Sequence, residues 1–180
     1  GSYTGAFSNA NVGTGKTVTI TSSYSGADSG NYSVTDQSST TADISTKALT
    51  ATASASNKTY DGGTTASTTL TFSGLVGSET LGQTVGSTFD NKNVGSNKSV
   101  SVNSITLADG TGLAANYSIN AGQTTTANIT AKSLTVSGIT GINKVYDGNA
   151  VVTLDSSSVT YSGLVSGDSF VGAYSGVFAN

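Results

Sequence analysis

The sequence contains no cysteine, histidine, methionine, tryptophan or proline in its 180 residues, and all seven basic residues are lysine. Without cysteine and histidine the chain lacks the residues of Ser-His-Asp and Cys-His catalytic sites. It also lacks the usual protein ligands of zinc, haem and iron–sulfur clusters. We therefore expect no enzyme activity, no catalytic residue, no metal site and no cofactor.

Charge and long apolar runs are scarce as well. Only 9% of the residues are charged, and the net charge is -3. Seven lysines do not supply the basic surface that binds nucleic acid, and no apolar run approaches the roughly 18 residues of a membrane-spanning helix. We expect neither a nucleic-acid partner nor membrane insertion. A chain of this composition that avoids cysteine fits an exported protein, so we expect an extracellular location, secreted or on a bacterial surface.

The apolar residues that are present are mainly Val, Ile, Leu, Tyr and Phe, placed singly among Ser and Thr. This alternation, with Gly, Asn and Asp at the turns, predicts short strands rather than helices. The expected strands cover residues 17–21, 32–35, 42–45, 49–55, 68–72, 84–89, 99–106, 117–120, 127–130, 134–137, 151–154 and 159–161. About seven strands in roughly 85 residues predict an all-β fold of small immunoglobulin-like β-sandwich modules in an elongated array. Modules of a β-grasp type are the alternative.

Internal repetition is the strongest signal in the chain. The strings F-S-N-A-N-V-G at 7–13 and F-D-N-K-N-V-G at 89–95 correspond, as do N-K-T-Y-D-G at 57–62 and N-K-V-Y-D-G at 143–148. F-S-G-L-V at 72–76 also returns as Y-S-G-L-V at 161–165. Positions 7 and 89 are 82 apart, positions 61 and 147 are 86 apart, and positions 75 and 164 are 89 apart. The chain therefore holds almost two periods of a tandem repeat.

Two module frames fit this period. One frame has modules at 1–87 and 88–175, with 176–180 beginning the next repeat. The other has one complete module at 48–131 between two half-modules. We favour the first frame for independent folding, because half-modules bury too little apolar surface. In either frame the recurring apolar positions are expected to form the core: Phe7, Val18, Ile44, Leu75, Phe89, Val100, Ile129, Leu164 and Phe178.

The recurring motif K-x-Y-D-G supplies the candidate site residues: Lys58, Tyr60, Asp61, Gly62, Lys144, Tyr146, Asp147 and Gly148. The structural interpretation is that Tyr packs on the core, Asp and Gly form a tight turn, and Lys pairs with Asp across it. The functional interpretation is a ligand patch repeated along the array, in which Tyr stacks on a sugar or peptide. The structural interpretation is favoured.

The motif, its period and the S-G-L-V string that follows it resemble the YDG/MBG-type repeat regions of large bacterial surface proteins such as filamentous-haemagglutinin-like adhesins. The resemblance covers essentially the whole chain. It implies a surface-exposed stalk or adhesin array, and it carries over no catalytic or ligand-binding residue.

Three functions are consistent with these features. The first is a structural repeat segment of an adhesin that forms an extended stalk or fibre, with the neighbouring modules of the same chain as partners. The second is a multivalent adhesive module that binds a glycan or a matrix protein. The third is a subunit of a self-assembling extracellular filament, in which copies pair through exposed strand edges.

The sequence leaves open two ways in which a cysteine-free stalk could be stiffened, structural calcium and an isopeptide bond. Structural calcium needs clustered carboxylates; Asp28, Asp36 and Asp43 lie near one another in the sequence, but their counterparts between 116 and 128 are mostly not acidic. An isopeptide bond needs a lysine, an Asn or Asp, and an acidic neighbour. The lysines recur, but no acidic residue obviously recurs with them.

Overall fold

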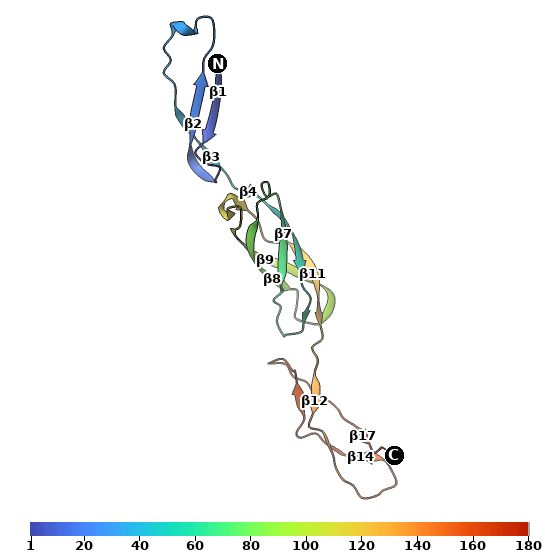
Figure 1. Ribbon diagram of the computed structural model, residues 1–180. Coiled ribbons are helices and arrows are strands. Elements are labelled where there is room, and N and C mark those ends of the chain that lie inside the picture. The colour runs from blue at the N-terminus through green and yellow to red at the C-terminus, as the bar shows by residue number, and fades with distance from the viewer. Residues whose placement is uncertain (180) are drawn as a thin grey trace. The chain divides into compact units, whose positions relative to one another are not determined.

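The computed structural model describes residues 1–179, and its regular structure there consists of β-strands with two short 3₁₀ turns (Figure 1). The expectation of an all-β chain is confirmed. The chain divides into two compact units: residues 1–53, 69–86 and 102–123 form the first, and 54–68, 87–101 and 124–179 lie in the second. Strands β8 (Leu81–Phe89) and β9 (Gly95–Asp109) have residues in both units.

The first unit begins with an antiparallel sheet made by residues 1–44, which we call the N-terminal segment. Its strands, in the order β1-β2-β3, are β1 (Ser2–Phe7), β2 (Gly13–Ser23) and β3 (Ser39–Ile44). A 3₁₀ turn, η1 (Ser29–Asn31), lies between β2 and β3. Along the second half of β2, half-buried residues alternate with exposed ones, as the period of two requires. No residue of the N-terminal segment is fully buried, since its single sheet has no second layer.

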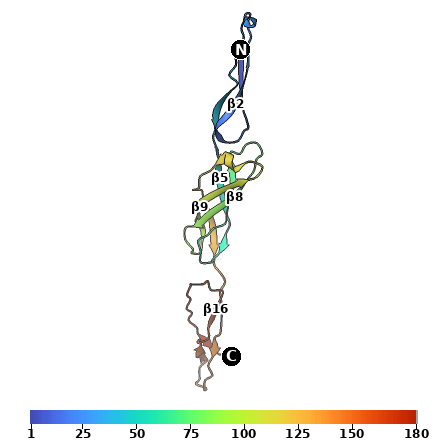
Figure 2. The ribbon, with the colours of Figure 1, turned by 90° about the vertical axis from the view of Figure 1, so that its left-hand side faces the viewer.

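The rest of the first unit contains the strands that follow this sheet in the chain. Strand β4 (Lys47–Ala48) runs parallel to β10 (Tyr117–Ser118), which follows the 3₁₀ turn η2 (Ala114–Asn116). Strand β5 (Thr50–Ala55), labelled in Figure 2, pairs with β7 (Thr68–Ser73). The large apolar side chains that this unit buries are Leu49, Leu70, Val102 and Tyr117.

The second unit contains a hydrophobic cluster next to a parallel strand pair. Strand β6 (Lys58–Thr59) runs parallel to the end of β11 (Thr124–Thr130), and β11 is antiparallel to β9. The sheet order is β6-β11-β9-β8. The clustered residues are Ala66, Phe89, Val100, Ala127 and Ile129, and the partly buried Ala55 and Tyr60 pack against them.

Residues 132–179, the C-terminal segment, complete the second unit with short strand pairs. The pairs are β12 (Thr135–Ser137) with β16 (Thr160–Ser162), β13 (Thr140–Gly141) with β15 (Leu154–Asp155), and β14 (Val151–Val152) with β17 (Gly176–Val177). No residue from 132 to 179 is fully buried. Its aromatic side chains contact one another instead. The centres of the Tyr161 and Phe170 rings lie 5.2 Å apart, and the hydroxyl oxygens of Tyr161 and Tyr174 lie 2.6 Å apart.

The predicted core is correct at three positions of the middle repeat, and it is wrong at Leu75 of that repeat and at the positions predicted in the two terminal segments. Phe89, Val100 and Ile129 are at most 3% exposed. In contrast, Phe7 is 40% exposed, Leu164 38% and Phe178 50%, and Val18, Ile44 and Leu75 are half-buried. Every fully buried residue that the structure describes lies between positions 49 and 129. In the terminal segments the same residue types stay more exposed because each segment carries only half of the repeat.

The predicted strand at 32–35 is also absent, although its counterpart at 117–120 is found in part as β10. The difference has a clear cause. Strand β10 exists because it pairs with Lys47 and Ala48. Tyr32 and Ser33 have the same sequence pattern, but no strand pairs with them among the described residues. Without a partner strand the pattern does not form a β-strand.

Candidate functional site

The K-x-Y-D-G motif of the second unit forms a turn closed by its own lysine. Lys58 lies on β6 and places its ammonium 2.8 Å from Asp61 Oδ1, 2.8 Å from the Gly63 carbonyl and 3.1 Å from the Thr65 carbonyl. The ammonium also lies 5.5 Å from the centre of the Phe89 ring. The N–H donors of this ammonium therefore all have acceptors within its own loop, and the ammonium packs against the core through Phe89.

Asp61 completes the turn from the opposite side. Its Oδ1 accepts a hydrogen bond from the Gly63 backbone N–H at 2.9 Å, which makes an Asx turn. Gly62 has a φ of 81°, a left-handed conformation that favours glycine. The hydrogen bond from Lys58, followed by the one from the Gly63 N–H, lowers the pKa of Asp61 from its usual value.

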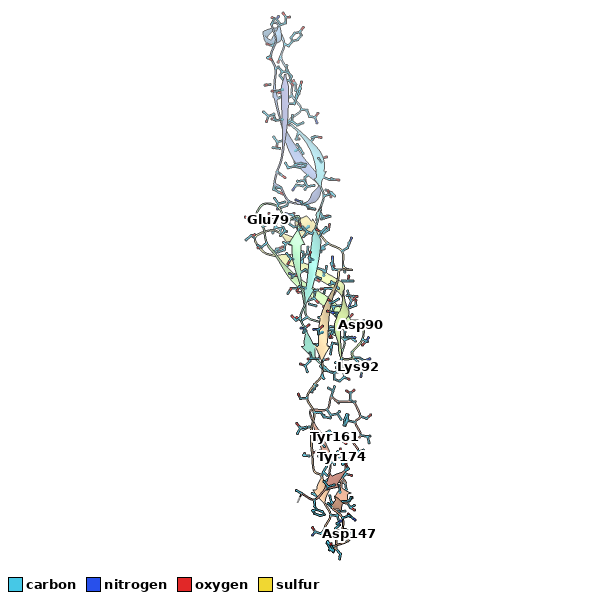
Figure 3. All side chains as sticks on the ribbon, turned by 90° about the vertical axis from the view of Figure 1, so that its right-hand side faces the viewer. Glu79, Asp90, Lys92, Asp147, Tyr161 and Tyr174 are labelled. Atoms are coloured by element: carbon cyan, nitrogen blue, oxygen red, sulfur yellow. The ribbon has the colours of Figure 1, made fainter. Side chains whose placement is uncertain are left out.

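The copy of the motif in the C-terminal segment has the same internal bonds. The Lys144 ammonium lies 2.7 Å from Asp147 Oδ1 and 2.9 Å from the Asn149 carbonyl, and it faces the Phe178 ring at 6.0 Å. Gly148 has a φ of 79°. The hydrogen bond from Lys144 lowers the pKa of Asp147, whose side chain is labelled in Figure 3. The Lys–Asp pairing and the glycine turn expected from the sequence are thus present in both copies.

The two tyrosines of the motif, in contrast, have different surroundings. Tyr60 packs against the hydrophobic cluster, and its hydroxyl donates a hydrogen bond to Asp168 at 2.7 Å. Lys92 approaches the same carboxylate at 3.5 Å. Tyr146 is 94% exposed. The structure therefore brings Lys, Asp and Gly together in both copies but gives the tyrosine a packed place in only one.

A second tyrosine–carboxylate contact occurs in the first unit. The buried Tyr117 hydroxyl donates a hydrogen bond to Glu79 and accepts one from the Val76 N–H at 3.1 Å. The hydrogen bond to Glu79, whose side chain is labelled in Figure 3, raises the pKa of Tyr117. Glu79 and Asp168 follow the two S-G-L-V strings at the same distance, so they occupy equivalent positions of the repeat. In the sequence neither acid stands near the tyrosine that it contacts, and the common spacing after S-G-L-V is the signal that relates the two acids.

Glu79 lines one small hollow, and Tyr60, which bonds to Asp168, lines another. In the first unit a hollow of about 280 Å³ is lined by Val12, Ile44, Ser45, Lys47 and Val76 together with Glu79 and Tyr117. In the second unit a hollow of about 270 Å³ is lined by Val94, Lys132 and Val165 together with Tyr60, Leu164 and Phe170. Val12, Lys47 and Val76 are the repeat equivalents of Val94, Lys132 and Val165. Both volumes fall below the roughly 300–1,000 Å³ typical of ligand pockets.

The loops at the start of β2 and β9 are closed by lysines in a related manner. Lys98 lies 2.9 Å from Asp90 and 2.7 Å from Asn91 Oδ1, and its equivalent Lys16 lies 2.5 Å from Asn9 Oδ1. The hydrogen bond from Lys98 lowers the pKa of Asp90, whose side chain is labelled in Figure 3. Within residues 1–179 there is no group of three acidic side chains arranged to hold a metal ion. The described part of the chain also has no helix long and apolar enough to cross a membrane.

Comparison with known proteins gives one family. A family model described as the YDG domain matches residues 1–42, 45–127 and 130–180. No curated protein and no solved structure matches the chain.

Proposed function

Because the chain belongs to the YDG domain family, we propose that it is a structural repeat segment of a secreted or surface-anchored bacterial adhesin, in which modules joined end to end form an extended stalk or fibre. The observation that carries this proposal is the internal use of the recurring motif. Lys58 and Asp61, like Lys144 and Asp147, bond to each other and to their own loop. A motif whose polar atoms are satisfied internally is suited to holding a fold rather than to chemistry on a substrate, and the proposal assigns it no catalytic role.

We place the module at residues 48–131, as a small β-sandwich of the immunoglobulin-like kind. Two observations support this frame over modules at 1–87 and 88–175. One of the three family matches spans 45–127 without interruption. All the fully buried residues of the described chain also fall between 49 and 129, so this stretch carries the apolar burial that a module needs.

The stalk function is tested by measuring length against repeat number. Arrays of two, four and eight repeats are compared by electron microscopy and small-angle scattering. A stalk grows in maximum dimension by a constant amount for each added repeat. Arrays that collapse to a globule, whose radius grows only with about the 0.38 power of chain length, would contradict the proposal.

A second candidate function, multivalent adhesion to a glycan or matrix protein, is favoured by exposed aromatic side chains. Tyr3 is 67% exposed and lies edge to face with Tyr24, at 6.2 Å between ring centres. Such pairs provide a stacking surface for a sugar ring. A glycan array probed with the chain and with a Tyr3→Ala variant tests it, and equal retention of both proteins on every glycan would refute it.

A further inference from the structure

One hydrogen bond of the second unit crosses the boundary between two successive repeats. With the module at 48–131, Tyr60 belongs to that module and Asp168 belongs to the repeat that follows it. The Tyr60 hydroxyl donates to Asp168 Oδ2 at 2.7 Å, and the Lys92 ammonium lies 3.5 Å from Oδ1 of the same carboxylate. One acid of the following repeat therefore contacts two side chains of the module.

The backbone at Tyr60 is held on both sides of the tyrosine. Its N–H donates to the Thr130 carbonyl at 2.8 Å, and its ring packs against the hydrophobic cluster. Lys58 before it and Asp61 after it are bonded to each other at 2.8 Å. The lysine-closed turn is thus a positioning element, because it fixes the hydroxyl of Tyr60 before the hydroxyl meets its acceptor.

The loop that presents the acid is built alike in the two repeats. The Asp168 N–H donates to the Val165 carbonyl at 3.0 Å, and the N–H of the equivalent Glu79 donates to the Val76 carbonyl at 3.1 Å. Glu79 likewise accepts a tyrosine hydroxyl, that of Tyr117. In both repeats the acid is therefore held by a turn of its own and accepts a charge-assisted hydrogen bond from a tyrosine.

The covalent connection across the boundary does not by itself fix the two repeats. The chain passes from the module to the following repeat through residues 131–134, which belong to no strand. Linked domains move relative to one another unless the interface between them is large and hydrophobic. No residue from 132 to 179 is fully buried, so apolar burial does not fix this boundary.

We propose that the tyrosine of the K-x-Y-D-G motif is a latch between repeats: Tyr60, bonded to Asp168, fixes the following repeat against the module that precedes it. The partner of the motif is the S-G-L-V loop of the next repeat with the acid that follows it. The latch rests on the proposed stalk function and adds stiffness to it, since contacts between neighbours act beyond the repeats themselves in such arrays.

A distance measurement between two spin labels tests the latch in the intact chain, which has no cysteine of its own. Thr126→Cys on β11 and Ser157→Cys on a turn of the C-terminal segment place the labels on either side of the boundary, at exposed positions outside the hollow. The proposal predicts one narrow distance distribution. Tyr60→Phe keeps the ring and removes the hydroxyl, and Asp168→Ala removes the acceptor. Because each loses a hydrogen bond to a charged group, each is expected to raise the population outside the narrow peak about tenfold.

Tyr146→Phe is the matched control, because Tyr146 has the equivalent position in the second copy of the motif and is 94% exposed. It is expected to leave the distribution unchanged. A broad distribution in the labelled chain with Tyr60 intact, no broadening in Tyr60→Phe, or equal broadening in Tyr146→Phe would each overturn the latch. The growth of array length with repeat number is a separate measurement, so failure of the latch and failure of the stalk function are distinguishable.

Discussion

At the scale of single residues, burial separates positions that the sequence makes equivalent. Ile129 is 1% exposed and Ile44 is half-buried, although they are equivalent residues near the end of the same strand of the repeat. Phe89 is 3% exposed and its equivalents Phe7 and Phe178 are 40% and 50% exposed. The environment of a residue here depends on whether both halves of the repeat surround it, so equivalent substitutions are expected to have unequal effects.

Ile129→Ala is expected to lower the free energy of unfolding by about 2–5 kcal/mol, because it leaves a cavity in a fully enclosed site. Ile44→Ala removes the same atoms from a half-exposed site, and we expect a loss below about 1 kcal/mol. Urea unfolding followed by circular dichroism measures both. Equal losses in the two variants would mean that the N-terminal segment has a core of its own.

Acid is expected to weaken the lysine-closed turns. Lys58 and Lys144 lower the pKa of Asp61 and Asp147 in the folded chain. A lowered folded pKa gives stability that is present above the unfolded value of about 3.9 and is lost as the pH falls through the folded pKa. The melting temperature of the native chain should therefore fall more steeply below about pH 4 than that of Asp61→Asn. Superimposable pH profiles for the two proteins would show that the pairing does not stabilise the fold.

At the scale of elements, the local sequence pattern predicted the turns, but it did not predict contacts between residues far apart in the sequence. The Lys58–Asp61 and Lys144–Asp147 pairs span three residues, so spacing alone revealed them. Tyr60 meets Asp168 across 108 positions, and no periodicity within one repeat reports such a contact. The expected strand at 32–35 failed for a related reason, because a strand needs a partner that its own residues do not specify.

The tyrosine–carboxylate contact of β10 has a matched pair of variants. Tyr117→Phe removes the hydroxyl that donates to Glu79 and accepts from the Val76 N–H, and leaves both partners unsatisfied. We expect a loss of roughly 1–3 kcal/mol in unfolding free energy. Tyr32→Phe, at the 75% exposed equivalent position, should change stability by less than about 0.5 kcal/mol. Chemical denaturation distinguishes the two variants. An unchanged unfolding free energy in Tyr117→Phe would show that the contact does not stabilise the fold.

At the scale of the whole molecule, the sequence predicted an all-β chain and the repeat. The all-β character followed from alternation of apolar residues with Ser and Thr, and the family match covers the same repetition. The position of the buried core within the repeat did not follow, since Phe7, Phe89 and Phe178 carry equivalent strings. Only three-dimensional burial distinguishes them, and it supports the proposed module at 48–131.

The most direct test of this account is single-molecule extension of a tandem array of the repeat. If each repeat is one cooperative module of a mechanical stalk, the force curve shows regular unfolding peaks. Successive peaks are separated by the extended length of one repeat, about 300 Å at roughly 3.3–3.6 Å per residue, less the end-to-end length of the folded module. A smooth extension without peaks, or spacings that correspond to half a repeat or to two repeats, would contradict it.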